Sequence, residues 1–422
     1  MNQGPRRRSS LSYIDTNGTQ SLRKHRPDYN LVIISIVLLV VGLITIYAIS
    51  PGLSQSSNTS PSYYVVKQLL AIGLGLVGFG IVVWLPVEVW QKYIKPLIII
   101  SIGSAFIVRL VGQRVNGAYR WIQLGGFSFQ AVELIKFTLL IWLAAFLAKR
   151  IREGKIKDSK STLKPLIIVL VVIGVVVAGL QSDLGSTGVM VAMMAAMCFV
   201  AGLPLKRVAM IAGIVVIGLI LAISGSSYRR QRLLTFLHPT QNCQSTTTGY
   251  QACQALVAVG SGGLFGKGLG KGVQYYGYLP ESDNDSIFAV YAEQFGYVGV
   301  LVLICLFGAL FVRLKHIMEK APDSYTRFIV MGVLAWLASQ TIINIGAMIG
   351  LLPLKGITLP LISYGGTSIV FVMVALGLVF NISHYTTART TDEQTLRGGD
   401  DENFALRRRN GRTYYAHLSN RT

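Results

Sequence analysis

Three carboxylates stand close together at the point where a polar, glycine-rich stretch gives way to an apolar run. They are Glu281, Asp283 and Asp285, and the apolar run begins at Ile287. A charged side chain at the bilayer centre costs roughly 2.5–3.5 kcal/mol on insertion scales, and less near the interface. A carboxylate at the mouth of a membrane helix is therefore expected to have a chemical role. We predict that Asp285 is a catalytic base that acts on a lipid-linked substrate.

A structural role is the alternative for Asp285. A carboxylate just before a helix can accept hydrogen bonds from the first backbone N–H groups, and Asn284 beside it favours this interpretation. Capping would account for one acid and would leave Glu281 and Asp283 unexplained. Acids two residues apart repel, so the pKa of one of them is expected to rise, which would suit a base. The sequence leaves open whether Asp283 or Asp285 is that base.

Other charged residues lie within the apolar runs or at their ends. Glu133 and Lys136 are three residues apart on one helix face, so they are expected either to pair or to line a substrate cavity. Asp183 follows an apolar run, in the break at 181–185, where its carboxylate could cap the next helix. Each of these residues therefore has a structural interpretation beside the functional one.

Cations also gather on the side where membrane proteins usually carry few. Arg229 and Arg232 follow an apolar run there. Because a guanidinium group binds phosphate oxygens bidentately, these arginines could hold either a substrate pyrophosphate or ordinary lipid headgroups. The glycine-rich run 260–272 lacks the Ser or Thr that follows the lysine of a nucleotide-binding loop, because Gly268 follows Lys267. Its backbone could still hold an anion, or the run could be a flexible re-entrant loop.

The elements that must position these residues are membrane helices. Of the 422 residues, 52% are hydrophobic and 14% charged, and the mean hydropathy is +0.54, which excludes a soluble protein of this length. The apolar runs are continuous, not alternating, which excludes a barrel. Several reach about 20 residues, the length that crosses a hydrocarbon core. We predict an all-α polytopic membrane protein with ten transmembrane helices, at about 31–50, 64–85, 96–111, 132–148, 165–180, 187–203, 208–224, 286–312, 327–350 and 367–384.

The distribution of basic residues predicts the orientation. Most of the 39 lysines and arginines fall in the two tails and in the even-numbered links, which places these segments and both termini in the cytoplasm. The predicted organisation is a basic tail at 1–29, a membrane domain at 30–385 and a basic tail at 386–422. A large extracytoplasmic loop, 225–285, separates the seventh and eighth spans. The net charge of +21 therefore indicates cytoplasmic loops and no nucleic-acid partner.

Two questions stay open at this level. Cys243 and Cys253 share the 225–285 loop, and they would form a disulfide only if that loop faces an oxidising compartment. The sequence identifies no cofactor and no metal ligand, and it leaves open a requirement for a divalent cation, Mg²⁺ or Mn²⁺.

Five segments, in this order on ten spans, resemble the FtsW/RodA/SpoVE family, the SEDS proteins of shape, elongation, division and sporulation. The resemblance covers residues 27–383, and the start of its last segment, Lys355-Gly356, is closer to the cell-division branch than to the elongation branch. The segments are NGAYRWIQLGGFSFQAVELIK (116–136), QSDLG (181–185), YQACQALVAVGSGGLFGKGLG (250–270), YLPESDNDSIFAVYAEQFGYVG (278–299) and KGITLPLISYGGTS (355–368).

The resemblance implies a peptidoglycan glycosyltransferase that polymerises lipid II. The reaction takes place on the outer face of the bacterial inner membrane at the division septum, with a class B penicillin-binding protein and other divisome proteins as partners. The implied reaction is an inverting transfer in which the 4-hydroxyl of one GlcNAc attacks the anomeric carbon of the next MurNAc. Undecaprenyl pyrophosphate is already a good leaving group, so one base and a set of cations suffice.

The resemblance also assigns residues. The catalytic acid of the family falls on Asp285, although the surrounding Asp283-Asn284-Asp285-Ser286 replaces a common His-Thr-Asp-Phe. The residues expected to bind substrate are Arg120, Gln130, Glu133, Lys136, Asp183, Arg229, Arg232, Lys267, Glu281, Asp283, Lys355, Ser363 and Tyr364.

Two other functions stay in competition with the enzyme. A transporter that flips lipid II would be lined by Glu133, Lys136 and Asp183, but the charged motifs cluster on one face and no helix break at the membrane midplane is plain. A non-catalytic scaffold of the division machinery would bind a single-span partner whatever the state of its cavity.

Overall fold

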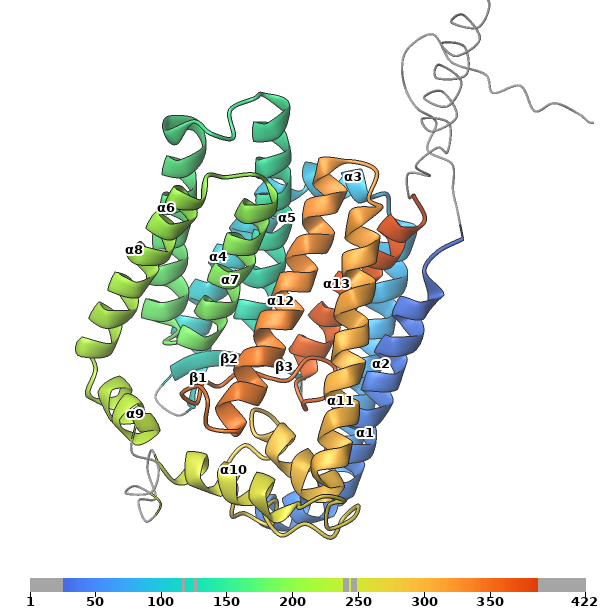
Figure 1. Ribbon diagram of the computed structural model, residues 1–422. Helices are drawn as coiled ribbons and strands as arrows, with labels where there is room; N and C mark the ends of the chain where they lie inside the picture. Colours follow the sequence, from blue (N-terminus) through green and yellow to red (C-terminus); the bar gives the residue numbers. More distant parts are fainter. Residues whose placement is uncertain (1–25, 116–117, 125–126, 238–242, 244–248, 386–422) are drawn as a thin grey trace, which may run out of the picture. The chain divides into compact units, whose positions relative to one another are not determined.

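The structure of this chain is a computed structural model that describes residues 26–115, 118–124, 127–237, 243 and 249–385. Apart from a few residues before the first helix, the two predicted basic tails lie outside the described residues. The described part is a bundle of long helices with a small sheet and two short helices gathered toward one end (Figure 1).

Helices account for most of the first half of the chain. Their bounds are α1 (Tyr29–Ser57), α2 (Tyr63–Trp84), α3 (Val87–Lys92), α4 (Ile94–Val111), α5 (Ala131–Arg152) and α6 (Lys164–Ile173), with π-helical turns η1 (Ser159–Leu163) and η2 (Gly174–Leu180) at the two ends of α6. The second half continues with α7 (Leu184–Val200), α8 (Leu205–Ser224), α9 (Ser227–Leu237), α10 (Tyr250–Ser261), α11 (Ile287–Glu319), α12 (Ser324–Met348) and α13 (Gly366–Ser383).

Eight segments of the described chain are long and apolar enough to cross a membrane. They are α1, α2, α4, α5, the stretch Ser159–Leu180, α11, α12 and α13. The helix α7 is apolar but has 17 residues, and the 20-residue α8 occupies the predicted seventh span. Large apolar side chains such as Leu110 and Leu221 are exposed, as contact with lipid requires. The polytopic membrane protein is confirmed, whereas the count of ten spans stays a prediction.

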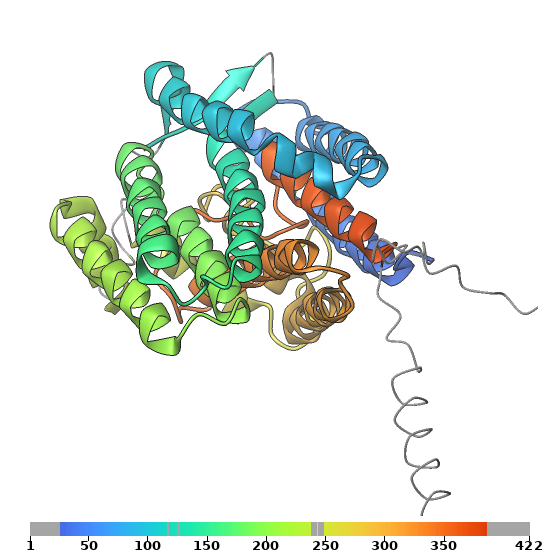
Figure 2. The ribbon, with the colours of Figure 1, turned by 90° about the horizontal axis from the view of Figure 1, so that it is seen from above.

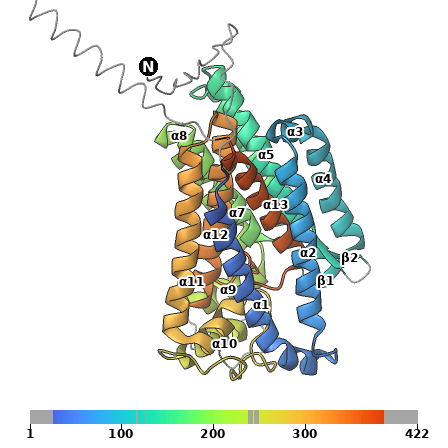
Figure 3. The same ribbon diagram turned by 90° about the vertical axis from the view of Figure 1, so that its right-hand side faces the viewer.

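Packing divides the bundle into neighbouring pairs. The last helix, α13, lies against α2, and α1 lies beside α2 (Figures 2 and 3). The helix α12 contacts α5, α7 and α11, so it occupies the middle of the bundle. It buries apolar residues such as Trp336 and Leu337 among them. The contacts of α12 therefore join α5 and α7 to the later helices α10, α11 and α13.

A three-stranded antiparallel sheet interrupts the helical architecture that the sequence predicts. Its strands are β1 (Gln113–Val115), β2 (Ala118–Leu124) and β3 (Phe127–Gln130), in the order β1-β2-β3. Trp121 pairs with Gln130, and Ile122 pairs with Phe129. The sequence predicts no strand in this segment and places it between the spans 96–111 and 132–148, so the sheet is a correction. Strand β3 runs directly into α5, so the sheet fixes the entry to that helix.

The first helix is longer than predicted. The expected end at Pro51-Gly52 is wrong, because α1 includes Pro51 and ends at Ser57, before the left-handed Asn58. Membrane helices tolerate a proline when neighbouring groups satisfy the freed backbone. A Cβ atom on Gly52 would lie 2.7 Å from the ring of Tyr275, so the glycine allows the extended helix to pack closely on a later loop.

The predicted loop 225–285 contains α9 and α10, which lie at the lower end of Figure 1. A disulfide joins Cys243 to Cys253, which answers the question that the sequence left open. The glycine-rich segment 262–272 that follows α10 packs on α11.

The eighth predicted span contains a break that the sequence analysis missed. Gly296 has φ 64° and ψ −166°, so the helical hydrogen-bond pattern of α11 is interrupted there. Backbone groups of the glycine-rich segment pair with those that the break releases. The four hydrogen bonds run from Lys267 N to Glu293 O (3.0 Å), Gly268 N to Gln294 O (3.0 Å), Tyr297 N to Gly263 O (2.9 Å) and Val298 N to Leu264 O (3.1 Å).

Glycine is required in this segment because two backbones meet. A Cβ atom on Gly262 would lie 2.1 Å from the carbonyl oxygen of Ala292, and one on Gly266 would lie 2.1 Å from that of Gln294. The run 260–272 is therefore a packed support for the break in α11. This explanation replaces both the flexible loop and the anion-binding loop.

We expect Gly262→Ala to lower the melting temperature of the purified protein, because overpacking costs about 1–3 kcal/mol. Gly260→Ala is the matched control, since Gly260 lies two residues away in α10 and a Cβ atom there meets nothing within 4 Å. The control should melt at the same temperature or slightly higher, as removing a helical glycine gains about 0.5–1 kcal/mol. Equal melting of the two variants would contradict the close approach.

Candidate functional site

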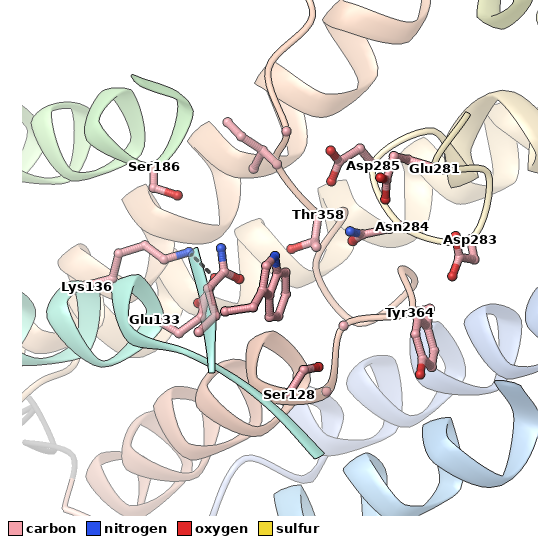
Figure 4. A pocket seen from close by; sticks show the side chains of 16 residues that line it. Ser128, Glu133, Lys136, Ser186, Glu281, Asp283, Asn284, Asp285, Thr358 and Tyr364 are labelled. Carbon is pink, nitrogen blue, oxygen red and sulfur yellow. Dashed lines mark ion pairs between the residues drawn. The ribbon is translucent and has the colours of Figure 1, made fainter. Parts of the chain in front are cut away.

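A cavity of about 230 Å³ opens among the sheet, α5, the start of α7 and two loops, 281–286 and 356–366. Figure 4 shows the acids on one side of it and the Glu133–Lys136 pair on the other. The loop 281–286, which we call the acid loop, immediately precedes α11. Seven of the predicted site residues line this cavity, namely Gln130, Glu133, Lys136, Glu281, Asp283, Asp285 and Tyr364.

Backbone contacts hold the acid loop against the segment that precedes α13. Tyr364 donates its backbone N–H to the carbonyl oxygen of Asp283 at 2.8 Å. Ser363 donates its hydroxyl to the carbonyl oxygen of Asn284 at 2.7 Å, and it accepts a hydrogen bond from the backbone of Leu359. Ser363, predicted to bind substrate, therefore has its side chain committed to holding the loop.

Asp285 lies half-buried at the cavity wall. The capping alternative for it is wrong, because Ser286 occupies the N-cap position of α11. The hydroxyl of Ser286 donates to the carbonyl oxygen of Pro280 at 3.0 Å and accepts from Gln251 Nε2 at 3.1 Å. The turn is thus closed by Ser286, and the carboxylate of Asp285 belongs to the cavity.

The acid loop holds carboxyl groups that are close to one another and partly withdrawn from solvent. Burial, and then the neighbouring Glu281, raise the pKa of Asp283 to about 7. Glu281 has a backbone φ of 51°, in the left-handed region that non-glycine residues rarely adopt. The expectation that one acid has a raised pKa is met at Asp283. This group could exchange a proton near neutral pH.

Glu133 and Lys136 form the ion pair that their spacing predicts. The Lys136 Nζ lies 2.8 Å from Glu133 Oε1, and the two side chains are 1% and 3% exposed. Lys136 also donates to Gln340 Oε1 at 3.1 Å. Glu133 Oε2 is buried and has no hydrogen-bond partner among the described residues. Glu133 and Lys136 therefore pair with each other and also line the cavity, so both expected arrangements occur together.

A group of three cations includes Lys355, which immediately precedes the cavity residue Gly356. Burial, then Arg232 and Arg229, lower the pKa of Lys355, whose neighbour Gly356 is part of the cavity wall. Arg229 donates to the carbonyl oxygen of Ala178 in η2 at 2.9 Å, and Arg232 donates to that of Leu354 at 3.3 Å. Helix α9 thus brings two neighbouring arginines close to Lys355, which lies more than 100 residues later in the sequence. We call Lys355, Arg229 and Arg232 the cation group.

Asp183 takes the structural role that the sequence suggested for it. Its carboxylate accepts hydrogen bonds from Ser186 N at 3.0 Å and from Ser186 Oγ at 2.8 Å, so it caps α7. It lies close enough to Lys355 to favour the charged form of that lysine. Asp183 therefore supports the site from the start of α7.

Two predicted residues are placed differently or lie beyond description. Lys267 pairs with Glu293 Oε1 at 2.8 Å, and Glu293 also accepts from the backbone of Val273 and Gln274. Its charge neutralises a buried acid of α11, which gives Lys267 a structural role, and its assignment to the substrate stays a prediction. Arg120 belongs to β2, but its side chain is outside what the structure describes.

Some cavity residues were missed from the sequence. Trp121 and Ser128 line it beside Gln130, because Trp121 pairs with Gln130 across β2 and β3, and residues two apart on a strand share a face. Recognising the strands would have found them. Thr358 gives no such signal, since it lies in an irregular segment. Within the described ranges, no group of three or more His, Cys, Asp or Glu side chains is arranged to hold a metal.

Asp283 should make the stability of the protein depend on pH. The carboxyl group of Asp283 has a pKa of about 7 in the folded chain, whereas the ordinary pKa of an aspartate is 3.8. Between these two pH values the folded state therefore binds more protons than the unfolded state. Stability should therefore fall as pH rises from about 4 to 7 and then level. Melting curves of Asp283→Asn should show a flatter dependence and a higher melting temperature than the wild type at pH 8.

Asp158→Asn is the control for this measurement, because hydrogen bonds from Ser161 lower the pKa of Asp158 at the start of η1. Replacing Asp158 by Asn should act in the opposite direction and reduce the stability of the protein at neutral pH. An unchanged pH profile for Asp283→Asn would contradict the raised pKa.

Comparisons with known proteins agree with this geometry. The model of a family described as "Cell cycle protein", FtsW/RodA/SpoVE, matches residues 29–388. The probable peptidoglycan glycosyltransferase FtsW of Saccharophagus degradans is 37% identical over 366 residues, which cover 85% of this chain and 92% of that protein. Stage V sporulation protein E of Bacillus subtilis is 34% identical over 366 residues, covering 86% and 99%.

Solved structures show the same fold. A chain from the structure described as "Structural coordination of polymerization and crosslinking by a peptidoglycan synthase complex" is similar with a TM-score of 0.70 and 26% identity, covering 86% of this chain and 99% of that one. The rod shape determining protein RodA of Thermus thermophilus, as a D255A mutant, gives a TM-score of 0.63 and 28% identity, with coverage of 86% and 99%.

Proposed function

This chain belongs to the FtsW/RodA/SpoVE family, and from that premise we propose that it is a peptidoglycan glycosyltransferase. Its substrate is lipid II, which it polymerises into glycan strands on the outer face of the bacterial inner membrane at the division septum. In this proposal the membrane domain has ten spans with both termini in the cytoplasm. The observation that carries the proposal is a half-buried acid, Asp285, in a cavity whose wall includes Gly356, the neighbour of Lys355 in the cation group.

The reaction needs a base at one end of the cavity and positive charge at the other. Asp285 takes the proton from the 4-hydroxyl of GlcNAc as its oxygen forms a bond to the anomeric carbon of MurNAc. The bond from that carbon to the pyrophosphate breaks with inversion, and its electron pair leaves with undecaprenyl pyrophosphate. The cation group neutralises this charge, because guanidinium and ammonium groups bind phosphate oxygens.

The other cavity residues fit binding of the sugars. Glu133 Oε2 is a buried acceptor without a protein partner in the described structure, and a substrate hydroxyl or amide would satisfy it. Gln130 lies beside it at the start of α5 and offers both donors and acceptors. Asp283 is the alternative base, since a pKa of about 7 matches the working pH of a proton acceptor.

The partners of the chain follow from the same premise. A structural relative was solved in a peptidoglycan synthase complex that coordinates polymerization and crosslinking. We propose a class B penicillin-binding protein as the crosslinking partner, together with other divisome proteins in the bilayer. A requirement for Mg²⁺ or Mn²⁺ stays a prediction, and no step of the mechanism is assigned to a cation of this kind.

Asp285→Asn should abolish polymerisation of lipid II in the purified complex, with activity reduced at least 10²-fold, because the amide cannot accept the proton. The product is measured as glycan strands on a gel, with and without the partner. Asp158→Asn serves as the control because it also removes one carboxylate. Asp158 lies in the link between α5 and α6, which we place on the cytoplasmic side, so this variant should leave the rate unchanged.

Retained polymerisation by Asp285→Asn would overturn its role, and loss of activity in Asp283→Asn would then move the base to Asp283. Movement of labelled lipid II across vesicles without strand formation would favour the transporter. Normal division of cells that carry Asp285→Asn, with partner binding intact, would favour the scaffold.

A further inference from the structure

Two amide side chains lie on one face of α12, at the centre of the bundle. Gln340 and Asn344 are spaced i,i+4, so they stand one turn apart on the helix. They are 0% and 1% exposed. Uncharged amides are costly to bury in a membrane helix unless they are hydrogen-bonded. Their partners therefore indicate why α12 carries them.

Gln340 uses all of its hydrogen-bonding capacity. Its Oε1 accepts from Lys136 Nζ at 3.1 Å and from Trp336 Nε1 at 2.8 Å. Its Nε2 donates to the carbonyl oxygen of Thr358 at 2.9 Å and to the Thr358 hydroxyl at 3.0 Å. Gln340 thus connects the buried Glu133–Lys136 pair to the segment that follows Lys355.

Asn344 makes the corresponding connection to the acids. Its Nδ2 donates to the carbonyl oxygen of Asp285 at 2.8 Å and to that of Ile357 at 2.7 Å. Both amide hydrogens are used, and each goes to a different loop. Ile357 in turn donates its N–H to the carbonyl oxygen of Lys355 at 2.7 Å. Three hydrogen bonds, two of them donated by the Asn344 side chain, therefore connect the backbone of Asp285 to that of Lys355.

The position of this contact within the acid loop is informative. Three consecutive carbonyl oxygens of the loop each accept one hydrogen bond from outside it. Those of Asp283 and Asn284 are held by the neighbouring Tyr364 and Ser363, which belong to an irregular segment. Asp285 alone among the three is held from within a long helix, by Asn344. Helices position groups more rigidly than loops do.

We propose that Asn344 is a positioning residue that sets the backbone of Asp285 against the loop of Lys355. This inference rests on the proposed glycosyltransferase function and deepens it. Asn344 touches the backbone of the base and of the cation-bearing loop, so it acts through them. Displacing a catalytic group by about 1 Å can cost roughly 10²-fold in rate without removing any group that binds substrate.

The test replaces Asn344 with Asp, which has the same size but offers no N–H donor when ionised. The carbonyl oxygens of Asp285 and Ile357 both lose their partner. With the full chain and its partner, kcat for lipid II should fall about 10- to 100-fold, while KM stays within about twofold because the cavity residues are intact. A second variant, Asn344→Leu, removes the donors without adding charge and covers the case in which the Asp variant does not fold.

Asn381 provides a matched control. It is also buried, at 4% exposure, and its Nδ2 donates to two carbonyl oxygens, those of Val82 at 2.9 Å and Leu85 at 2.6 Å. These contacts join α13 to the end of α2, away from the cavity. Asn381→Asp and Asn381→Leu make the same chemical change and should lower the melting temperature comparably while leaving kcat within about twofold.

A second readout does not depend on activity. Hydrogen–deuterium exchange of the amides in 281–286 and 355–358 should be faster in the Asn344 variants than in the wild type, and unchanged in the Asn381 variants. Equal exchange in the Asn344 and the Asn381 variants, or an equal loss of kcat in the two sets of variants, would overturn the positioning role. A rise of KM at constant kcat would also overturn it. A wild-type complex that makes no glycan contradicts the proposed function instead, and the exchange result still decides the role of Asn344.

Discussion

The structure depends on the requirement that every backbone polar group at membrane depth finds a partner within the protein. The requirement is met by regular helices along most of the chain, but the site is built from irregular segments. At Gly296 the helix α11 is interrupted, and the glycine-rich segment satisfies its released groups. At the acid loop, three carbonyl oxygens are satisfied from α12 and from the segment before α13. Irregular backbone can therefore carry charged residues at the edge of the membrane.

This requirement explains the division of labour between charged residues. Some neutralise one another and support the frame, as Lys267 and Glu293 do beneath the glycine-rich segment. Others are held close to groups of the same sign, which costs free energy and changes their protonation. Burial and then Glu281 raise the pKa of Asp283, and burial and then two arginines lower the pKa of Lys355. Perturbed groups of opposite charge around one cavity are typical of sites that transfer protons and bind anions.

Much of this could be predicted from residue types and spacing. The continuous apolar runs indicated a polytopic membrane protein, and the positions of Glu133 and Lys136 on one helix face predicted their ion pair. Asp183, standing just before a helix, was expected to cap it and does so. Each of these depends on residues a few positions apart, for which helical geometry fixes the distance. The site residues predicted within the motifs 116–136 and 278–299 likewise include six of the sixteen residues that line the cavity.

Other features needed the folded chain. The sequence placed Lys267 with the substrate because it could not show that Glu293, 26 residues later, would be buried beside it. It missed Asn344, since an amide within an apolar run has no partner that spacing reveals. The first span was expected to end at about residue 50, yet α1 continues through Pro51 to Ser57 and packs closely on a distant loop at Gly52. The sequence by itself therefore determined the membrane helices and the local pairs along them. The tertiary structure alone decided which charges became partners and which faced the cavity, because burial and long-range contacts set the free energy of each charge.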